Sequence, residues 1–393
     1  MIDYEKMLTK EVRELKPSGI RKFFDIAAEM KNVISLSIGE PDFKTPWNIR
    51  EAGVKNLNEG ATWYSSNQGM IKLRQEVCNY QKRRFGVSYH PEDECLITVG
   101  GSEGIDLIIR ALVSEGDEVL IPQPCYVAYE PLVELQKGVP VIINTKPENQ
   151  FRLTKEEVLE HLTDKTKLLI LPYPNNPTGA VLTEKELIGI SEALEGTNVL
   201  VLSDEIYGEL TYEREHISAP SIGSLYERTL LIGGFSKAFA MTGWRLGYVL
   251  GPEAIIKHIN KIHQYAIMCA PTTSQHAAIE ALKNGSESVS KMRKEYDMRR
   301  RYLLSALSKI GLECFPAKGA FYLFPSIKST GLTSEEFCTR LLYSKNVAVV
   351  PGTAFGDSGE GFVRISYSYS LNHLKEAISR IEEFLNELKE DKK

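Results

Sequence analysis

Four side chains with different chemistry follow two short apolar runs near the middle of the chain. The first run ends in Ser-Asp-Glu-Ile-Tyr, which carries Asp204 and Tyr207, and the second ends in Gly-Gly-Phe-Ser-Lys, which carries Lys237. Arg245 follows eight residues after that lysine. A lysine on such a turn can form an imine with an aldehyde, a carboxylate can hold a pyridine nitrogen protonated, and an arginine with small hydroxyls can bind phosphate. Together these groups could bind a phosphorylated pyridine aldehyde.

The elements that must position these groups are short buried strands. The runs 199–202 and 230–232 are continuous, apolar and bounded by polar residues or glycine, a pattern typical of such strands. Similar runs at 95–99, 118–121 and 167–171 alternate with helical patterns. In open α/β sheets, ligands bind beyond the carboxyl ends of the strands, so we expect the four side chains at that edge.

A glycine-rich turn at Gly100-Gly101-Ser102 joins the strand 95–99 to an amphipathic helix. The free N–H groups and the dipole at the start of a helix attract anions, so Gly101 and Ser102 are candidate phosphate donors. Many α/β turns are glycine-rich, so this turn alone is a weak signal.

Two further polar groups stand in segments that would otherwise be rigid or apolar. The turn Pro-Asn-Asn-Pro-Thr-Gly can aim a side-chain amide, carried by Asn176 or, as the less favoured alternative, by Asn175. Arg364 lies between two apolar residues of a predicted strand, where a cation is costly unless it is paired. It either forms an internal salt bridge or binds a substrate carboxylate with its guanidinium fork.

The motifs as a set resemble one family. Gly-Phe-Ser-Lys-Ala-Phe-Ala-Met-Thr-Gly-Trp-Arg is similar to the lysine signature of the class I/II aminotransferases, the fold-type-I pyridoxal phosphate enzymes of the aspartate/aromatic aminotransferase kind. Ser-Asp-Glu-Ile-Tyr and Asn-Pro-Thr-Gly resemble the cofactor-binding segments of that family, and the motifs keep the family's order from Ile34 to Tyr367. The resemblance implies an aminotransferase that moves an amino group from an L-amino acid to a 2-oxo acid through a pyridoxal 5'-phosphate–lysine imine.

The resemblance also implies a role for each site residue. Lys237 would form the imine and move the substrate proton, Asp204 would hold the ring nitrogen, and Tyr207 would bind the phenolate oxygen. The implied cofactor-binding residues are Tyr64, Gly101, Ser102, Tyr126, Asn176, Asp204, Tyr207, Ser236, Lys237 and Arg245. The implied contacts to the substrate carboxylate are Gly39, Asn176 and Arg364, and no metal ligand is expected.

Some of these positions have an ordinary structural interpretation as well. Tyr126 would stack on the pyridine ring and Tyr64 would reach the phosphate of the neighbouring subunit, which implies a homodimer with shared active sites. Taken alone, Gly39 could be a plain turn glycine, Tyr64 a loop tyrosine and Tyr126 a core tyrosine. The chain departs from the family at Gly234, where many members carry a serine or threonine for the phosphate, so Arg245 and Ser102 would bear more of that binding.

Two other functions share this fold. A pyridoxal phosphate-dependent carbon–sulfur β-lyase uses the same lysine, but the segment Leu-Ser-Ile-Gly-Glu-Pro-Asp resembles the aminotransferase version. A transcription regulator with an aminotransferase-like domain would need a DNA-binding domain, for which we see no room before Ile34.

The expected fold class is α/β. We expect a large domain at 46–285, with a mostly parallel sheet and helices on both faces, and a smaller α+β domain that combines 1–45 with 286–393. The resemblance implies that the large sheet has seven strands.

Composition limits the partners and the compartment. The 393 residues carry a net charge of −5 without a basic patch, so small-molecule amino acid and 2-oxo acid substrates are expected rather than nucleic acid. No apolar run has the roughly 18 residues that a membrane span needs, and the first residues do not resemble a signal peptide. The six cysteines are widely spaced, which indicates reduced thiols in a cytoplasmic protein.

Overall fold

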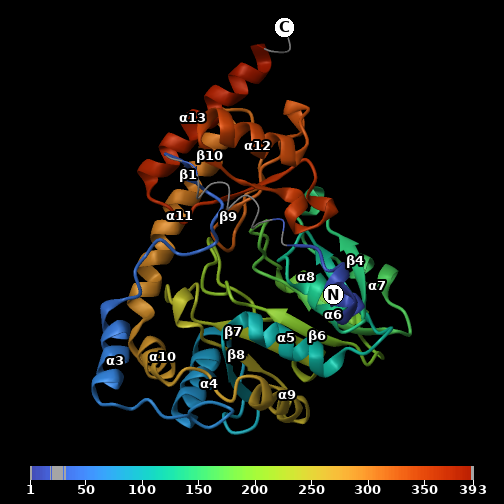
Figure 1. Ribbon diagram of the computed structural model, residues 1–393, viewed down its shortest axis with the longest axis vertical. Coiled ribbons are helices and arrows are strands. Elements are labelled where there is room, and N and C mark those ends of the chain that lie inside the picture. Colours follow the sequence, from blue (N-terminus) through green and yellow to red (C-terminus); the bar gives the residue numbers. More distant parts are fainter. Residues whose placement is uncertain (1, 18, 20–29, 31, 391–393) are drawn as a thin grey trace.

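The computed structural model describes residues 2–17, 19, 30 and 32–390. The molecule is elongated, with a broad part built on a large sheet below and a smaller part above, next to the C-terminus (Figure 1). The long helix α11 (Ser286–Lys309) runs along one side and connects the two parts (Figure 1). The first 33 residues have a helical pattern of mixed charge, and part of this predicted segment lies outside the described residues. The described portion contains the 3₁₀ turn η1 (Glu5–Met7) and the short helix α1 (Lys10–Glu14).

The broad part contains a seven-stranded sheet. Across the sheet the strands follow the order β2 (Cys95–Thr98), β8 (Gly247–Leu250), β7 (Thr229–Gly234), β6 (Leu200–Asp204), β5 (Thr166–Leu171), β3 (Glu118–Gln123) and β4 (Val139–Asn144). Strand β8 is antiparallel to both β2 and β7, and the remaining pairs are parallel. The prediction of an α/β fold with a mostly parallel, seven-stranded sheet is confirmed.

Helices cover both faces of this sheet. Because successive strand residues point to opposite faces, Leu202 and Ile232 pack on one side, whereas Val201 and Leu231 pack on the other. The first side is covered by α5 (Gly101–Leu112), α6 (Tyr129–Leu135) and α9 (Glu253–Ala266). The second side is covered by α4 (Ile71–Phe85), α7 (Lys155–His161), α8 (Glu184–Ala193) and α10 (Thr272–Asn284), and α3 (Trp47–Asn58) packs on α10. Burial on both faces explains why the strands are continuous apolar runs.

Local sequence signals set where several helices begin. Thr154 and Thr183 each accept a hydrogen bond from the backbone three residues later, and a glutamate at that later position bonds back to the threonine N–H. This capping box satisfies backbone groups that the first helical turn leaves without partners. Helix α12 (Ser334–Lys345) begins in the same way at Thr333.

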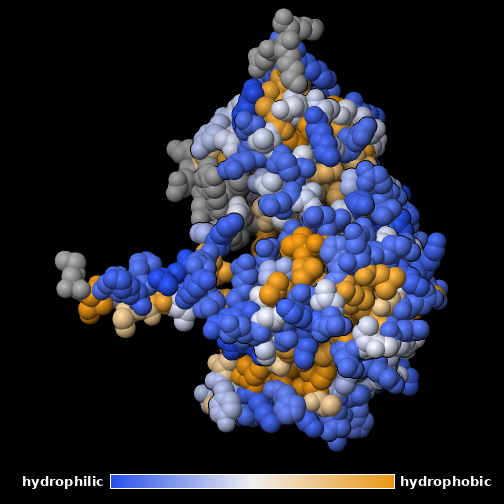
Figure 2. All heavy atoms as spheres, turned by 90° about the vertical axis from the view of Figure 1, so that its right-hand side faces the viewer, coloured by the Kyte–Doolittle hydropathy of each residue, from blue (hydrophilic) through white to orange (hydrophobic). Residues whose placement is uncertain are grey.

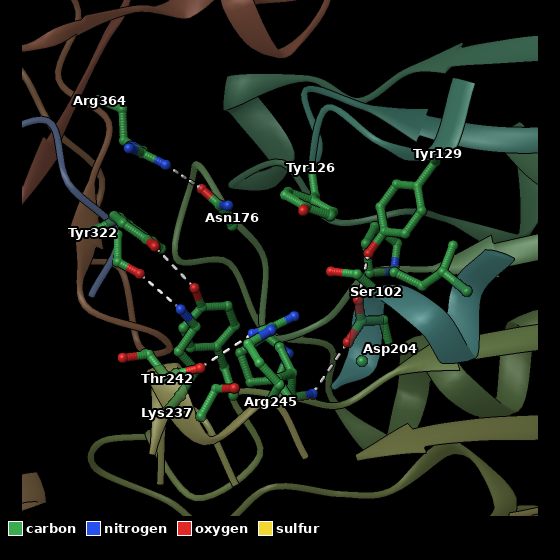
Figure 3. A pocket seen from close by; sticks show the side chains of 18 residues that line it. Ser102, Tyr126, Tyr129, Asn176, Asp204, Lys237, Thr242, Arg245, Tyr322 and Arg364 are labelled. Carbon is green, nitrogen blue, oxygen red and sulfur yellow. Dashed lines mark hydrogen bonds between the residues drawn. The ribbon is translucent and has the colours of Figure 1, made fainter. Parts of the chain in front are cut away.

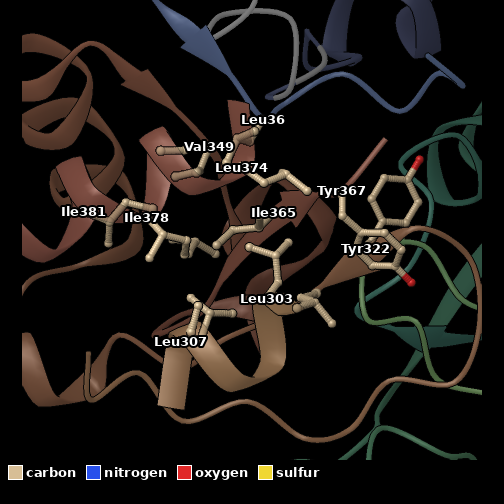
Figure 4. Close-up of a cluster of buried hydrophobic side chains, with 14 of the residues drawn as sticks. Leu36, Leu303, Leu307, Tyr322, Val349, Ile365, Tyr367, Leu374, Ile378 and Ile381 are labelled. Carbon is tan, nitrogen blue, oxygen red and sulfur yellow. The ribbon is translucent and has the colours of Figure 1, made fainter. Parts of the chain in front are cut away.

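The smaller part combines the two ends of the chain. Strand β1 (Ile34–Ser35) pairs with β10 (Val347–Ala348), and an antiparallel sheet has the order β11 (Val350–Pro351), β12 (Val363–Ser366) and β9 (Tyr322–Leu323). Leu36 shares a core with Leu303 of α11, Ile365 of β12 and Leu374 of α13 (Leu371–Glu390) (Figure 4). This shared core supports the proposed domain division at 46 and 285, which stays a prediction.

The alternating pattern in Ile34–Asp42 also predicts a strand that ends in a glycine turn, and this strand is shorter in the structure. Ile34 and Ser35 pair with β10, and the backbone of Leu36 still bonds to Ala348 and to Ser366. The residues after Leu36 leave the strands and approach the large part. Within the described residues, no helix combines the length and the apolar character that crossing a membrane requires.

Candidate active site

A cavity of about 390 Å³ lies between the two parts, at the carboxyl ends of β5, β6 and β7 (Figure 3). Every predicted site residue except Tyr64 lines it. These residues are Gly39, Gly101, Ser102, Tyr126, Asn176, Asp204, Tyr207, Ser236, Lys237, Arg245 and Arg364. The parallel strands thus bring to one place groups that are far apart in the sequence.

Lys237 follows the end of β7 and points into the cavity. Its Nζ donates a hydrogen bond of 2.7 Å to the carbonyl oxygen of Gly39. Burial lowers the pKa of Lys237 to about 8; the charge of Glu40 opposes this shift, whereas Arg364 and Arg245 add to it. A lysine with this pKa is partly unprotonated near neutral pH, as a nucleophile and proton acceptor must be.

Asp204 is the last residue of β6 and is buried. Its Oδ2 accepts a hydrogen bond of 2.7 Å from the Tyr129 hydroxyl, and its Oδ1 accepts one of 3.2 Å from the backbone N–H of Ile206. Burial raises the pKa of Asp204, and these two hydrogen bonds act against the rise. Both donors are neutral, so these two bonds leave the carboxyl group available to pair with a cationic ring nitrogen.

The cradle for a phosphate forms where α5 begins. Gly100 has φ +81°, and a Cβ added there would lie 2.8 Å from Nη2 of Arg245. The backbone of Gly101, the hydroxyls of Ser102 and Ser236, and the Arg245 guanidinium all line the same cavity. Helix-terminal N–H groups, hydroxyls and a guanidinium are the donors that phosphate prefers, so the residues fit this group.

Arg364 of β12 is buried in a mostly neutral environment. Its Nη1 donates to Oδ1 of Asn176 at 2.9 Å, and its Nη2 donates to the backbone oxygen of Ser37 (Figure 3). The guanidinium lies 4.5 Å from the ring centre of Tyr322 and 4.9 Å from that of Phe355, and its Nε has no hydrogen-bond partner. Burial lowers the pKa of Arg364. A buried cation that has no acidic partner among the described residues is suited to bind the carboxylate of a ligand.

The two asparagines of the turn after β5 have different surroundings. Oδ1 of Asn175 accepts hydrogen bonds from both the backbone N–H and the hydroxyl of Thr178, at 2.9 and 2.7 Å. Its amide nitrogen donates to the backbone oxygen of Pro124 at 3.3 Å. Asn175 therefore holds the turn together, whereas Asn176 lines the cavity.

Two tyrosines of the site were not predicted from the sequence. Tyr129 bonds to Asp204, and the Tyr322 hydroxyl lies 2.8 Å from the Tyr207 hydroxyl. Tyr322 also explains the glycine at position 39, because a Cβ there would lie 2.3 Å from its hydroxyl oxygen. No local motif marks either tyrosine, since each reaches the site through contacts between distant elements.

Gly234, where the chain departs from its family's pattern, is closely covered by Ile206. A Cβ at position 234 would lie 2.6 Å from Cδ1 of Ile206, which itself lines the cavity. The isoleucine thus occupies the space that a serine or threonine would need.

Tyr64 is the one predicted site residue that the structure does not bring to the cavity. Its side chain is 76% exposed, on the segment that precedes α4. Within a single chain, therefore, most of the Tyr64 side chain faces away from the protein and it does not line the cavity.

Comparison with known proteins identifies the family. The family model described as aminotransferase class I and II matches residues 31–381. The chain belongs to this family. Members of the class I and II aminotransferases use pyridoxal phosphate, so the chain is a pyridoxal phosphate-dependent aminotransferase that moves an amino group between an amino acid and a 2-oxo acid.

Individual relatives agree with this assignment along nearly the whole chain. The putative aminotransferase YugH of Bacillus subtilis (strain 168) is 50% identical over 379 residues, which are 96% of this chain and 98% of the relative. The aspartate aminotransferase of Pyrococcus abyssi is 45% identical over 378 residues, covering 95% and 97%. The solved aromatic aminotransferase of Pyrococcus horikoshii OT3 superimposes with a TM-score of 0.89 at 42% identity, covering 94% and 99%.

Proposed function

We propose that this aminotransferase acts on L-α-amino acids whose carboxylate is bound by Arg364 and Asn176, while Lys237 moves the proton of the α carbon. The observation that carries the proposal is the buried Arg364 guanidinium, which faces the cavity beside Lys237 and has neutral hydrogen-bond partners. An arginine fork that holds the carboxylate fixes the direction of the α-carbon bonds, and such orientation contributes much of the rate enhancement in many enzymes.

The other residues would hold the cofactor. Pyridoxal phosphate supplies an aldehyde that takes up the amino group and a protonated ring that withdraws electrons from the α carbon. Asp204 is placed to keep the ring nitrogen protonated, and Tyr126 to stack on the ring. Tyr207 and Asn176 would donate hydrogen bonds to the phenolate oxygen.

Lys237 is proposed to serve as both base and acid. Its free amine would accept the proton from the substrate α carbon and return a proton to the aldehyde-derived carbon of the cofactor. A group that both accepts and donates a proton needs a pKa near the working pH. The pKa of about 8 that burial gives Lys237 fits this task. In the cofactor-free chain, the hydrogen bond from Nζ to the Gly39 oxygen keeps the amine inside the cavity.

A panel of amino donors tests the function. Acidic, aromatic, branched and small L-amino acids would be supplied with 2-oxoglutarate, and both the new amino acid and the new 2-oxo acid would be quantified. We expect equal amounts of the two products, and loss of both in Lys237→Ala, whereas the exposed-lysine control Lys291→Ala should match the wild type. Release of ammonia and pyruvate from sulfur-containing donors without amino transfer would instead identify a carbon–sulfur lyase.

We further propose that two copies form a dimer in which Tyr64 of each chain completes the partner's site. Large apolar side chains stay exposed around this tyrosine, and apolar patches interrupt the polar surface elsewhere (Figure 2). Trp63 is 70% exposed, and Tyr265 in the last turn of α9 is 88% exposed. A hydrogen bond from Asn67 to the Met268 oxygen joins the loop that carries Trp63 to the segment that follows α9. Exposed aromatic residues in such number are typical of an interface.

An open hollow next to the cavity gives a place for the partner. It has a volume of about 550 Å³ and shares Thr242 and Arg245 with the cavity, so it leads to the phosphate cradle. A side chain inserted from a second copy could therefore reach the phosphate and cover Arg245, which is exposed in the single chain.

Complementation tests the shared site. Co-expressed Lys237→Ala and Tyr64→Ala chains form heterodimers with one intact site and one doubly damaged site. Random pairing should then restore up to about a quarter of the wild-type activity, because half of the dimers are heterodimers with one of two sites working. Confirmed heterodimers without recovered activity, or an active monomer in light scattering, would contradict the proposal.

We also propose that the protein works in the cytoplasm. Its six cysteines are free thiols, which fits a reducing compartment. Fractionation of cells that express the chain at its natural level tests this assignment.

A further inference from the structure

A buried pair of hydrogen-bonded side chains lies behind the phosphate cradle, outside the cavity lining. His263 Nδ1 donates a hydrogen bond of 2.7 Å to Oε1 of Glu103. The histidine is fully buried and the glutamate side chain is 11% exposed. Nε2 of His263 is buried without a hydrogen-bond partner. A buried imidazole whose second nitrogen is unsatisfied calls for an explanation, and the proposed chemistry does not use this contact.

Glu103 also holds the turn that would bind the phosphate. Its second oxygen, Oε2, accepts a hydrogen bond of 2.5 Å from the backbone N–H of Val99. Val99 directly precedes Gly100, whose positive φ starts the turn, and Glu103 lies in the first turn of α5. The carboxylate therefore bridges both sides of the turn and fixes where the N–H groups of Gly101 and Ser102 point.

His263 provides a firm support for this carboxylate. It lies in the last turn of α9, and its backbone oxygen accepts hydrogen bonds from Ile267 at 2.9 Å and from Met268 at 3.2 Å. Helix α9 packs against α5 on the same face of the sheet. The imidazole thus joins the first turn of α5 to the end of a neighbouring helix.

The charge of Glu103 gives the contact its significance. A carboxylate in the first turn of a helix is favoured by the helix dipole, but it repels a phosphate that binds at the same helix end. Glu103 does not line the cavity, and its contact with His263 keeps the negative charge turned away from the cradle. Without the histidine, only the Val99 N–H would hold the carboxylate, which could then turn toward Ser102 and compete for the donors of the turn.

We propose that Glu103 and His263 are positioning residues for the cofactor phosphate: the histidine holds the glutamate, and the glutamate holds the turn. The proposal rests on the phosphate site proposed above at Gly101 and Ser102. It concerns affinity for the phosphate group, and it assigns neither residue a part in proton transfer.

The test compares the cofactor with its analogue that lacks phosphate. Full-length protein freed of cofactor is titrated with pyridoxal phosphate and with pyridoxal, and dissociation constants are taken from the quenching of protein fluorescence. For Glu103→Ala and for His263→Leu, we expect the dissociation constant of pyridoxal phosphate to rise about tenfold, the loss typical of a hydrogen bond to a charged group. The constant for pyridoxal should stay within about twofold, because that ligand makes no contact with the turn.

Further variants separate a positioning role from a general loss of stability. Glu103→Gln keeps the shape of the side chain and an acceptor for the Val99 N–H, so it should weaken phosphate affinity less than Glu103→Ala. If the alanine variant does not fold, the glutamine variant replaces it in the titrations. Tyr80→Phe is the matched control, because it removes a buried hydrogen bond to Glu209 that involves no residue of the turn or of the cavity lining, and it should change neither constant. Equal changes for both ligands, or no change for either, would overturn the proposal.

Ser102→Ala distinguishes this proposal from the one on which it depends. If Ser102→Ala weakens pyridoxal phosphate selectively while the Glu103 and His263 variants do not, the phosphate site stands and the positioning role is wrong. If Ser102→Ala also fails to act selectively, the phosphate does not bind at this turn.

Discussion

Nη1 of Arg364 donates a hydrogen bond of 2.9 Å to Oδ1 of Asn176, although the two residues are 188 positions apart in the chain. Arg364 belongs to the smaller part and Asn176 to the turn after β5 of the large part. The proposed carboxylate site therefore exists only while the two parts are packed together.

Arg364→Lys tests the guanidinium fork. Lysine keeps the positive charge but cannot make two parallel hydrogen bonds, so we expect kcat/KM for the amino donor to fall about 100-fold, as loss of a charge-assisted bond predicts. Steady-state kinetics measure this, with cofactor content checked by absorbance. Arg299→Lys is the control: that buried arginine pairs with Asp42 and Glu295, so its replacement should lower thermal stability without a selective loss of donor binding.

The lowered pKa of Lys237 predicts how cofactor uptake depends on pH. The free amine reacts with the aldehyde, and burial places the pKa at about 8 in the cofactor-free protein. The rate of uptake should therefore rise about tenfold per pH unit well below 8 and level off above it. Stopped-flow absorbance of the bound cofactor gives this rate. A profile that keeps rising to about pH 10, where an ordinary lysine titrates, would contradict the shift.

The same shift affects stability. The pKa of Lys237 is lower in the folded protein than the usual value of about 10.4 in an unfolded chain, so the unfolded state binds more protons between the two values. The destabilising effect of Lys237 is therefore fully present below pH 8 and disappears as the pH rises through this window. Lys237→Met should raise the melting temperature of the cofactor-free protein at pH 7, and this gain should shrink toward pH 10.

Asp204→Asn tests the anionic partner of the ring nitrogen. Asparagine keeps the size of the side chain and can still accept the bond from Tyr129, but it cannot stabilise a protonated ring. We expect proton removal from the substrate to slow by about 100-fold or more, which corresponds to the loss of one strong electrostatic contact. Single-turnover kinetics with α-deuterated substrate isolate this step, and an unchanged rate would show that Asp204 has another role. Tyr129→Phe should have a smaller effect, because it removes one neutral donor.

The contact between Gly234 and Ile206 predicts a double-variant effect. Gly234→Ser alone should not improve cofactor affinity, because its Cβ would meet Cδ1 of Ile206 at 2.6 Å. Ile206→Val removes that methyl group, so the double variant should hold the cofactor more tightly than either single variant, by about fivefold for one added hydroxyl–phosphate bond. Dissociation constants of the cofactor, measured for the wild type, the two single variants and the double variant, check this. If the two substitutions change the binding free energy additively, Ile206 does not block the position.

The sequence predicted site residues where a reactive or polar side chain directly follows a strand. Asp204, Lys237 and Asn176 could be predicted as neighbours because parallel strands end at one edge of a sheet. The strands β4 and β8 were not recognised individually: β4 includes partly exposed residues, and β8 directly follows the arginine motif without an intervening helix.

Side chains that reach the site across the fold could not be predicted. Tyr129 meets Asp204 because β3, β5 and β6 are adjacent in the sheet, and Tyr322 meets Tyr207 because the two parts pack together. Neither adjacency has a local signature. The contact between Glu103 and His263, 160 residues apart, escaped for the same reason, although the glutamate stood within the glycine-rich motif.

Because β1 pairs with β10 over only two residues, the segment 36–39 that follows it is held to the protein mainly by other contacts. This arrangement determines which mutations the segment tolerates. Ser37 and Gly39 reach the cations of the site through backbone oxygens, which bond to Arg364 and Lys237. A carbonyl group is the same in every residue, so replacing Ser37 leaves its bond to the arginine available. Inserting or deleting one residue between Ser35, which is held by β10, and Gly39 would shift both oxygens along the chain. The length of this segment is therefore more tightly constrained than the identity of Ser37.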